Sequence, residues 1–264
     1  MNNSKISNGT GEQNPYLSIV VPAYKEEGTV EKTLRRFDEY FREKDFTYEI
    51  LVVIDGHGDK TNEEVIALKD SIANLRWIDR AENKGKGYTV REGMREARGD
   101  VRLFTDMDNA TDIAHFDLML PLLKEGKDVV ICSREPWDAP GAKQAKAQPW
   151  HKRQLGNLGN LYIQLLVIPG IWDTQCGFKA FTREAAEAIF PITRIDRWAL
   201  DTEILGLARK FGFSIGIVPA HWIDDETTTV GAGGYGYVHT LLEVTKVGWW
   251  LLINSYGIKK RYEE

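Results

Sequence analysis

Cysteine is scarce in this sequence, and several kinds of segment are missing from it. The 264 residues contain two cysteines, Cys132 and Cys176, with neither Cys-x-x-Cys nor metal-ligand spacing, which favours a reduced, cytoplasmic setting. No stretch reaches the roughly 20 apolar residues that a membrane-spanning helix needs. Residues 1–15 are polar and lack the apolar core of a signal peptide, so we expect a disordered lead-in.

Acidic side chains are absent from one long stretch of an otherwise acidic chain. The net charge of −5 argues against a general nucleic-acid binder, and residues 139–172 contain neither Asp nor Glu. The cationic or potentially cationic residues of that stretch are Lys143, Lys146, His151, Lys152 and Arg153. This composition predicts an anion-facing surface, although a solvated basic loop would have it too.

Two apolar stretches could contact a membrane without crossing it. Residues 161–172 are interrupted by Gln164, Pro169 and Gly170, and residues 247–253 are too short to span a bilayer. The Trp pair of the second stretch and the basic residues after it suit the headgroup zone, whereas a buried core helix explains both stretches equally well. We therefore expect a peripheral protein on the cytosolic face of a membrane, with residues 237–264 as an amphipathic helix packed on the domain or on the membrane surface.

Short apolar runs alternate with amphipathic helical stretches in the first half of the chain. The runs are residues 17–21, 48–54, 75–79, 101–105 and 129–133. Such alternation predicts an α/β fold, a mainly parallel sheet with helices on both faces. The second half is less regular: helices are expected over 151–167 and 198–211, a strand over 215–223 and a Gly-rich loop over 230–236. We found no repeat or linker, so residues 16–236 are predicted to form one domain.

Two carboxylates, Asp106 and Asp108, follow the apolar run 101–105 directly. A sparse pair of this kind suits Mg²⁺ or Mn²⁺ that also binds phosphate oxygens of a substrate, since Mg²⁺ usually takes one or two carboxylates and keeps several waters. An ordinary acidic turn, with Asn109 and Asp112 as helix caps, is the competing interpretation.

Polar residues also follow the other predicted strands, at the edge where open parallel sheets bind ligands. The segments are residues 22–27, 55–59, 80–87, 106–108 and Arg134. This coincidence favours a functional site over an ordinary turn. A dinucleotide-binding oxidoreductase would need a Gly-x-Gly-x-x-Gly turn after the first strand, and residues 22–28 do not contain one.

Four segments together resemble glycosyltransferase family 2, whose members have the Rossmann-like GT-A fold. They are VPAYKEE (21–27), IDGHGDKT (54–61), NKGKG (83–87) and DMD (106–108). More narrowly, DTQCGFK (173–179), FTRE (181–184) and RWALDTE (197–203) look like the dolichyl-phosphate β-glucosyltransferase group. The resemblance covers most of the chain, and it implies inverting transfer of glucose from UDP-glucose to a polyprenyl (dolichyl) phosphate.

The resemblance also implies roles for individual residues. Donor-nucleotide contacts would come from Pro22, Tyr24, Glu26, Asp55, Lys84, Lys86 and Asp106. The metal would bind Asp106 and Asp108, and Asp108, Asp173 and Asp201 would be catalytic. The acceptor phosphate would meet Arg134, Arg153 and Lys179, and the sugar would meet Gln175, Trp198 and Glu203. The family often has two successive acids where Ile54 and Asp55 stand, so one polar contact could be missing.

Three alternatives remain open at this point. A polyprenyl-phosphate mannose synthase using GDP-mannose is disfavoured because residues 224–228, after the last predicted strand, are acidic and hydroxylic where such synthases usually carry an arginine. A related transferase could use another sugar or a protein as acceptor. A non-catalytic lipid-surface module would not explain the polar residues at the strand ends.

Overall fold

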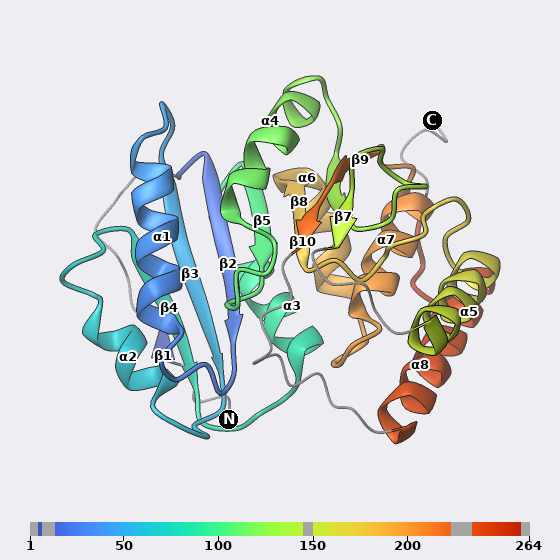
Figure 1. Ribbon diagram of the computed structural model, residues 1–264, viewed down its shortest axis with the longest axis horizontal. Helices are drawn as coiled ribbons and strands as arrows, with labels where there is room; N and C mark the ends of the chain where they lie inside the picture. Colours follow the sequence, from blue (N-terminus) through green and yellow to red (C-terminus); the bar gives the residue numbers. More distant parts are fainter. Residues whose placement is uncertain (1–4, 7–13, 145–149, 223–233, 260–264) are drawn as a thin grey trace.

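A computed structural model of the protein describes residues 5–6, 14–144, 150–222 and 234–259 (Figure 1). Within these ranges one sheet has the strand order β1-β4-β3-β2-β5-β8-β6-β9, and a small second sheet pairs β10 with β7. The strands of the large sheet are β1 (Lys5–Ile6), β2 (Leu17–Ala23), β3 (Tyr48–Asp55), β4 (Leu75–Arg80), β5 (Val101–Thr105), β6 (Val129–Ser133), β8 (Phe178–Thr182) and β9 (Ile215–Pro219). Those of the small sheet are β7 (Lys143–Gln144) and β10 (His221–Trp222).

The five apolar runs of the first half are all strands, as predicted. Strands β4, β3, β2 and β5 are parallel neighbours, and β6 is parallel to β9. Strand β8 lies between β5 and β6 and is antiparallel to both, and sequence patterns did not reveal it. All eight residues of β3 are buried, because helices cover both faces of the sheet.

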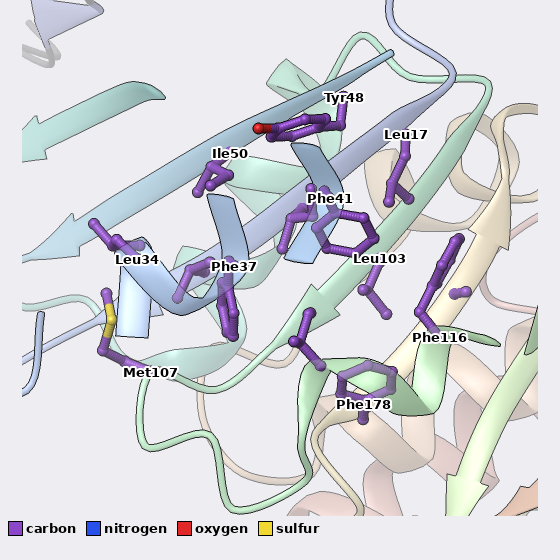
Figure 2. Close-up of a cluster of buried hydrophobic side chains, with 14 of the residues drawn as sticks. Leu17, Leu34, Phe37, Phe41, Tyr48, Ile50, Leu103, Met107, Phe116 and Phe178 are labelled. Carbon is purple, nitrogen blue, oxygen red and sulfur yellow. The ribbon is translucent and has the colours of Figure 1, made fainter. Parts of the chain in front are cut away.

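Two apolar clusters separate the sheet from its helices. On one face, α1 (Val30–Arg42), α2 (Thr61–Ala67) and α4 (Phe116–Lys124) pack on the sheet. Figure 2 shows part of this cluster, with Phe37 and Phe41 of α1 near Leu103 of β5. On the other face lie α3 (Lys86–Glu96), α5 (Trp150–Leu166), α6 (Arg183–Ile189), α7 (Leu200–Phe211) and α8 (Gly234–Leu252). Two short 3-10 helices, η1 (Ile113–His115) and η2 (Phe190–Ile192), complete the described elements.

Several boundaries differ from the sequence predictions. Residues 5–6 of the expected disordered lead-in form β1, antiparallel to β4, while residues 1–4 and 7–13 lie outside the described residues. The strand expected over 215–223 divides at Ala220 into β9 and β10. The C-terminal helix begins at Gly234, inside the expected Gly-rich loop, and ends at Leu252. Across the described ranges, no helix combines the length and the apolar character needed to cross a bilayer.

Candidate functional site

The carboxyl ends of β2, β3, β5 and β6 lie at one edge of the sheet, and the antiparallel β8 begins at that edge. The register pairs Thr105 with Phe178, which places Gly177 beside Asp106. A Cβ atom added at Gly177 would lie 2.0 Å from Asp106 Oδ2. Only glycine therefore leaves room for this carboxylate, and β8 delivers residues 173–177 to the ends of the parallel strands.

Asp106, Asp108 and Lys86 form the centre of the site. Lys86, the first residue of α3, places its Nζ 2.6 Å from Asp106 Oδ1. Burial alone would lower the pKa of Lys86, but Asp106 and Asp201 outweigh it and raise that pKa, so the side chain keeps its charge. One oxygen of Asp108 accepts a hydrogen bond from the backbone N–H of Ala110 at 3.0 Å, which orients the carboxylate.

The pKa of Glu26 is raised by burial and by the negative charge of the neighbouring carboxylates. Burial raises the pKa of Glu26 to about 7, and the nearby carboxylates of Asp108 and Asp106 add to the shift, while Lys86 opposes it. Two charged carboxylates therefore disfavour a third even with the ammonium present. A divalent cation would relieve this repulsion, so the donor set fits the predicted metal.

The metal prediction agrees with a sparse ligand set. No three His, Cys, Asp or Glu side chains converge into a ready metal cage in the part of the chain that the structure describes. Two carboxylates, with phosphate and water completing the shell, are the arrangement that Mg²⁺ commonly adopts.

Asp55 is a buried anchor at the end of β3. Its carboxylate accepts hydrogen bonds from Arg80 Nη2 at 2.5 Å and from the backbone N–H groups of Lys84 at 2.7 Å and Gly85 at 2.9 Å. It thereby holds the 83–87 loop against the strand end. These three donors occupy most of its acceptor capacity, so its clearest role is to position the loop that carries Lys86.

Two of the predicted site residues, Tyr24 and Trp198, are partly exposed aromatic side chains. Tyr24 and Trp198 are each 43% exposed, unusually open for large rings. The Lys86 ammonium lies 5.5 Å from the centroid of Trp198, whereas Lys84 Nζ lies 4.7 Å from that of Tyr88. Pro22 lies in β2, just before Tyr24. The structure thus brings Trp198 and Lys86 together.

Arg134 and Asp173 form the second charged group at this edge. Asp173 accepts from Arg134 Nε at 2.7 Å, Nη2 at 2.9 Å and the backbone N–H at 2.9 Å. Burial alone would raise the pKa of Asp173, but Arg134 lowers it to about 2. Burial likewise opposes the charge of Arg134, and Asp173 nevertheless raises its pKa. The carboxylate of Asp173 therefore holds the Arg134 guanidinium in one orientation.

Lys179 and Asp201 lie beneath the site. Lys179 is fully buried, and its Nζ donates to Asp201 Oδ1 and to the backbone oxygen of Cys176, both at 2.5 Å. The first four residues of β8 are all buried, because the strand is central in the sheet and helices cover both faces. The structure therefore speaks against the predicted contact between Lys179 and an acceptor phosphate. Asp201 is the counterion of Lys179, and its charge also acts on Lys86 and Arg134.

Glu203 is likewise committed to the fold. It has no exposed surface, and it accepts from the backbone N–H groups of Arg194 at 2.8 Å and Ile195 at 3.0 Å and from Tyr256 Oη at 2.6 Å. This bonding opposes the predicted contact between Glu203 and the sugar. Gln175 is part-buried, and its Nε2 donates to Thr174 and Thr202, both at 3.1 Å. The backbone of Arg153 lies in α5, but its side chain is outside the described residues.

Sequence reasoning missed two residues that shape the site. Asp138 accepts from the backbone N–H groups of Trp172 and Asp173, each at 2.8 Å, and so fixes the segment that carries Asp173. Trp222 of β10 lies 5.5 Å from the Arg134 guanidinium, measured to the ring centroid. The position of Trp222 at the end of a predicted strand was the available signal for it.

Comparisons with known proteins point to one family. The family model described as Glycosyl transferase family 2 matches residues 18–190. The chain is 33% identical over 257 residues to dolichyl-phosphate beta-glucosyltransferase ALG5A of Trichomonas vaginalis, covering 93% of this chain and 77% of that protein. It is also 33% identical to the human dolichyl-phosphate beta-glucosyltransferase, covering 80% and 68% of the two chains.

Solved structures show the same fold at lower identity. Mannosyl-3-phosphoglycerate synthase from Rubrobacter xylanophilus superposes with a TM-score of 0.65 at 17% identity, covering 93% of this chain and 76% of that one. Glucosyl-3-phosphoglycerate synthase from Mycobacterium tuberculosis, solved with Mn²⁺ and UDP-glucose, gives 0.61 at 20% identity, covering 88% and 79%. These similarities confirm the predicted GT-A fold.

Proposed function

Because the chain belongs to glycosyltransferase family 2, we propose that it transfers glucose from UDP-glucose to a polyprenyl (dolichyl) phosphate, with inversion at the anomeric carbon. The names of the relatives supply the acceptor, dolichyl phosphate, and the transferred sugar, glucose. The donor is proposed because a structural neighbour with the same fold was solved with UDP-glucose. The observation that carries the proposal is the placement, at one sheet edge, of a carboxylate pair with an ammonium beside a rigid guanidinium. Such an edge can bring together two anions that repel each other, which this reaction requires.

The donor half of the site is centred on the carboxylates. Asp106 and Asp108 would hold Mg²⁺ or Mn²⁺, which as a Lewis acid stabilises the charge of a departing diphosphate. Lys86, at 2.6 Å from Asp106, is placed to neutralise diphosphate oxygens directly. Tyr24 and Trp198 are each partly exposed, and we assign Tyr24 to the uracil base and Trp198 to the sugar. Pro22, Glu26, Asp55 and Lys84 complete the proposed nucleotide contacts, with Asp55 acting through the 83–87 loop.

The acceptor half of the site must bind a phosphate group, and it needs no strong general base. A phosphate monoester has a second pKa near 6 and is already a nucleophilic dianion at neutral pH. Asp173 agrees with this chemistry, because a carboxyl with a pKa of about 2 is a poor proton acceptor. We assign Asp173 to holding Arg134 and Asp201 to balancing Lys179, so both act by positioning. Arg134 is the proposed phosphate ligand, and Arg153 stays a prediction.

A product assay tests the proposal. Purified protein would be given a short polyprenyl phosphate, a divalent metal, and UDP-glucose, UDP-GlcNAc, UDP-galactose or GDP-mannose, and the product mass would be measured. We expect polyprenyl-phosphate glucose from UDP-glucose. Asp108→Asn should reduce turnover about 100-fold or more, as when a key electrostatic group is lost. Asp117→Asn, at an exposed position of α4 paired with Lys44, is the matched control.

Two results would contradict the proposal. Product formed from GDP-mannose alone would identify a mannose synthase. Wild-type turnover by Asp108→Asn would remove the carboxylate pair from the mechanism.

A further inference from the structure

The short strand β10 carries Trp222, an aromatic side chain that contacts the proposed phosphate ligand Arg134. The guanidinium carbon of Arg134 lies 5.5 Å from the centroid of the Trp222 ring, within the range of a cation–π contact. Asp173 holds the same guanidinium through hydrogen bonds from Nε and Nη2. The orientation of Arg134 therefore depends on the position of β10 as well as on Asp173.

Strand β10 is two residues long, so a small number of hydrogen bonds determines where it lies. The residue before it, Ala220, donates its N–H to the backbone oxygen of Ser133 and accepts from the N–H of Lys143, both at 2.8 Å. Strand β10 pairs with β7, which also has two residues (Figure 1). Trp222 adds an isolated bridge to Thr111. Because a pair of short strands is only marginally stable by itself, a further hydrogen bond to β10 has a large effect on its position.

His115 of η1 supplies that hydrogen bond. Its Nε2 accepts from the backbone N–H of His221, the first residue of β10, at 2.9 Å. Its Nδ1 lies 2.8 Å from the backbone oxygen of Asp112, which can only accept. These two partners fix the tautomer, with the proton on Nδ1 and none on Nε2. The hydrogen bond to β10 therefore requires a neutral imidazole.

The charged groups on the elements around His115 are either paired or basic. They are Asp112 with its partner Arg36 of α1, Asp117 with its partner Lys44, His221, and Lys143, which is opposite His221 in β7. The rings of His221 and of Phe178 in β8 lie edge-on to the His115 ring, with centroids 5.8 and 6.3 Å away. A proton added at Nε2 would thus break the hydrogen bond to β10 without gaining an unpaired carboxylate among these groups.

We propose that His115 is a positioning residue for Arg134: its neutral imidazole fixes β10, so that Trp222 packs on the guanidinium, and a proton at Nε2 releases the strand. The proposal rests on the proposed function, because it concerns how Arg134 binds the acceptor phosphate. Protonation turns Nε2 from an acceptor into a donor, which then faces the N–H of His221. Histidine is the side chain that ordinarily changes charge between pH 5 and 8, so use of the acceptor weakens at acid pH.

Steady-state kinetics with a short, water-soluble polyprenyl phosphate measure the effect on the acceptor. At pH 8 we expect His115→Ala to raise the KM for the acceptor about three- to tenfold, because one hydrogen bond is lost. Calorimetric titration should show unchanged affinity for Mn²⁺ and UDP, since Asp106 and Lys86 lie at the ends of other elements. His115→Gln, whose amide oxygen can accept from the His221 N–H, should restore the wild-type KM.

A double-mutant cycle tests whether His115 acts through β10. Trp222→Ala should also raise the KM for the acceptor, and adding His115→Ala to it should raise the KM no further, because residues that act through one another are not additive. His221→Gln is the matched control, since it removes the neighbouring imidazole and keeps the backbone donor. Independent, multiplying effects in the cycle would overturn the proposal, and so would equal losses in His115→Ala and His221→Gln.

The pH profile separates His115 from the acceptor itself. The second proton of a phosphate monoester titrates near pH 6, equally for every variant, so the ratio of the wild-type KM to that of His115→Gln isolates the imidazole. We expect this ratio to be about 1 at pH 8 and about three- to tenfold higher at pH 5.5. The same ratio at both pH values would overturn the proposal.

Hydrogen exchange at the His221 amide gives a measurement that does not depend on activity. At pH 7 exchange should be slower in the wild type and in His115→Gln than in His115→Ala, because the amide is hydrogen-bonded in the first two. Absence of glucose transfer by the wild type, with this exchange pattern intact, would refute the proposed function alone. Equal exchange in the wild type and His115→Ala would overturn the positioning role of His115.

Discussion

Two nearby lysines at the proposed donor site differ in their contacts, and we expect them to contribute differently to catalysis. Lys86 contacts Asp106 and Trp198, whereas Lys84 lies over Tyr88. We predict that Lys86→Met lowers kcat/KM for UDP-glucose by about 10- to 100-fold, because loss of one charge contact to a diphosphate removes a few kcal/mol of stabilisation. Lys84→Met should lower it less. Steady-state kinetics measure kcat/KM for both variants. Equal losses of kcat/KM would show that the contacts of Lys86 with Asp106 and Trp198 give it no larger role than Lys84.

Glu26 gives the protein a distinct pH dependence of stability. Its folded-state pKa of about 7 lies above the ordinary value of 4.5. The unfolded chain therefore releases this proton at lower pH than the folded chain, and the contribution of Glu26 is lost as pH rises toward and through 7. We predict that Glu26→Gln is more stable than the wild type at pH 8 and not at pH 5.

Urea unfolding at the two pH values, without added metal, measures this difference. Glu27→Gln, the same change at an exposed position of the same loop, is the control. If the gain in unfolding free energy for Glu26→Gln were the same at pH 5 and pH 8, the folded-state pKa of Glu26 would not be raised by burial and the neighbouring carboxylates.

For single residues, the sequence predicted which residues lie at the strand ends better than it predicted which way their side chains point. Asp106 and Asp108 were predictable because they directly follow a buried strand. The family resemblance placed Lys179 and Glu203 among the ligand contacts, and long polar side chains are indeed usually exposed. Their burial depends on partners distant in sequence, Asp201 and Tyr256, which no local pattern identifies.

Among the elements, β8 determines how the site is assembled. The alternating strands and helices of the first half were visible because each strand is a continuous apolar run. Strand β8 contains Lys179 in its middle and is joined to its neighbours by antiparallel pairing, so neither periodicity nor alternation predicted it. The compact segment 173–179 was nevertheless recognised as specific, and β8 explains why it reaches the strand ends.

The close contact between β8 and the end of β5 is testable at Gly177. Gly177→Ala would place a methyl group against Asp106 Oδ2. We predict that Gly177→Ala binds Mn²⁺ and UDP at least about tenfold more weakly than the wild type, since a misplaced ligand group loses charge contacts worth a few kcal/mol. Gly156→Ala, in α5 with nothing near its added Cβ, is the control. Calorimetric titration with unchanged affinity in Gly177→Ala would show that Asp106 can move freely.

At the scale of the molecule, the loop before Trp198, in the second half of the chain, packs against the start of α3 in the first half. A Cβ atom added at Gly85 would lie 2.4 Å from the backbone oxygen of Asp196, and one at Gly87 would lie 2.4 Å from that of Ile195. Arg91 Nη1 donates to the backbone oxygen of Thr193 at 3.0 Å. The start of α3, with Lys86, and the loop that leads to Trp198 therefore form one packed unit.

Glu203 stabilises this unit by accepting hydrogen bonds from Arg194, Ile195 and Tyr256. These hydrogen bonds lead to a prediction for the whole molecule. Glu203→Gln would present an amide NH₂ to one of the donors that the carboxylate now satisfies. We predict a loss of about 1–3 kcal/mol in unfolding free energy and faster hydrogen exchange at the amides of Arg194 and Ile195.

Turnover of UDP-glucose should fall in the same variant, because Trp198 follows the loosened loop, while UDP affinity should change little, because Asp55 holds the 83–87 loop independently. Glu31→Gln removes an exposed ion pair in α1 and should stay within about 0.5 kcal/mol of the wild type. Unchanged exchange at residues 194 and 195 in Glu203→Gln would mean that packing on Gly85 and Gly87 alone fixes the loop, and that Glu203 and Tyr256 have no part in holding it.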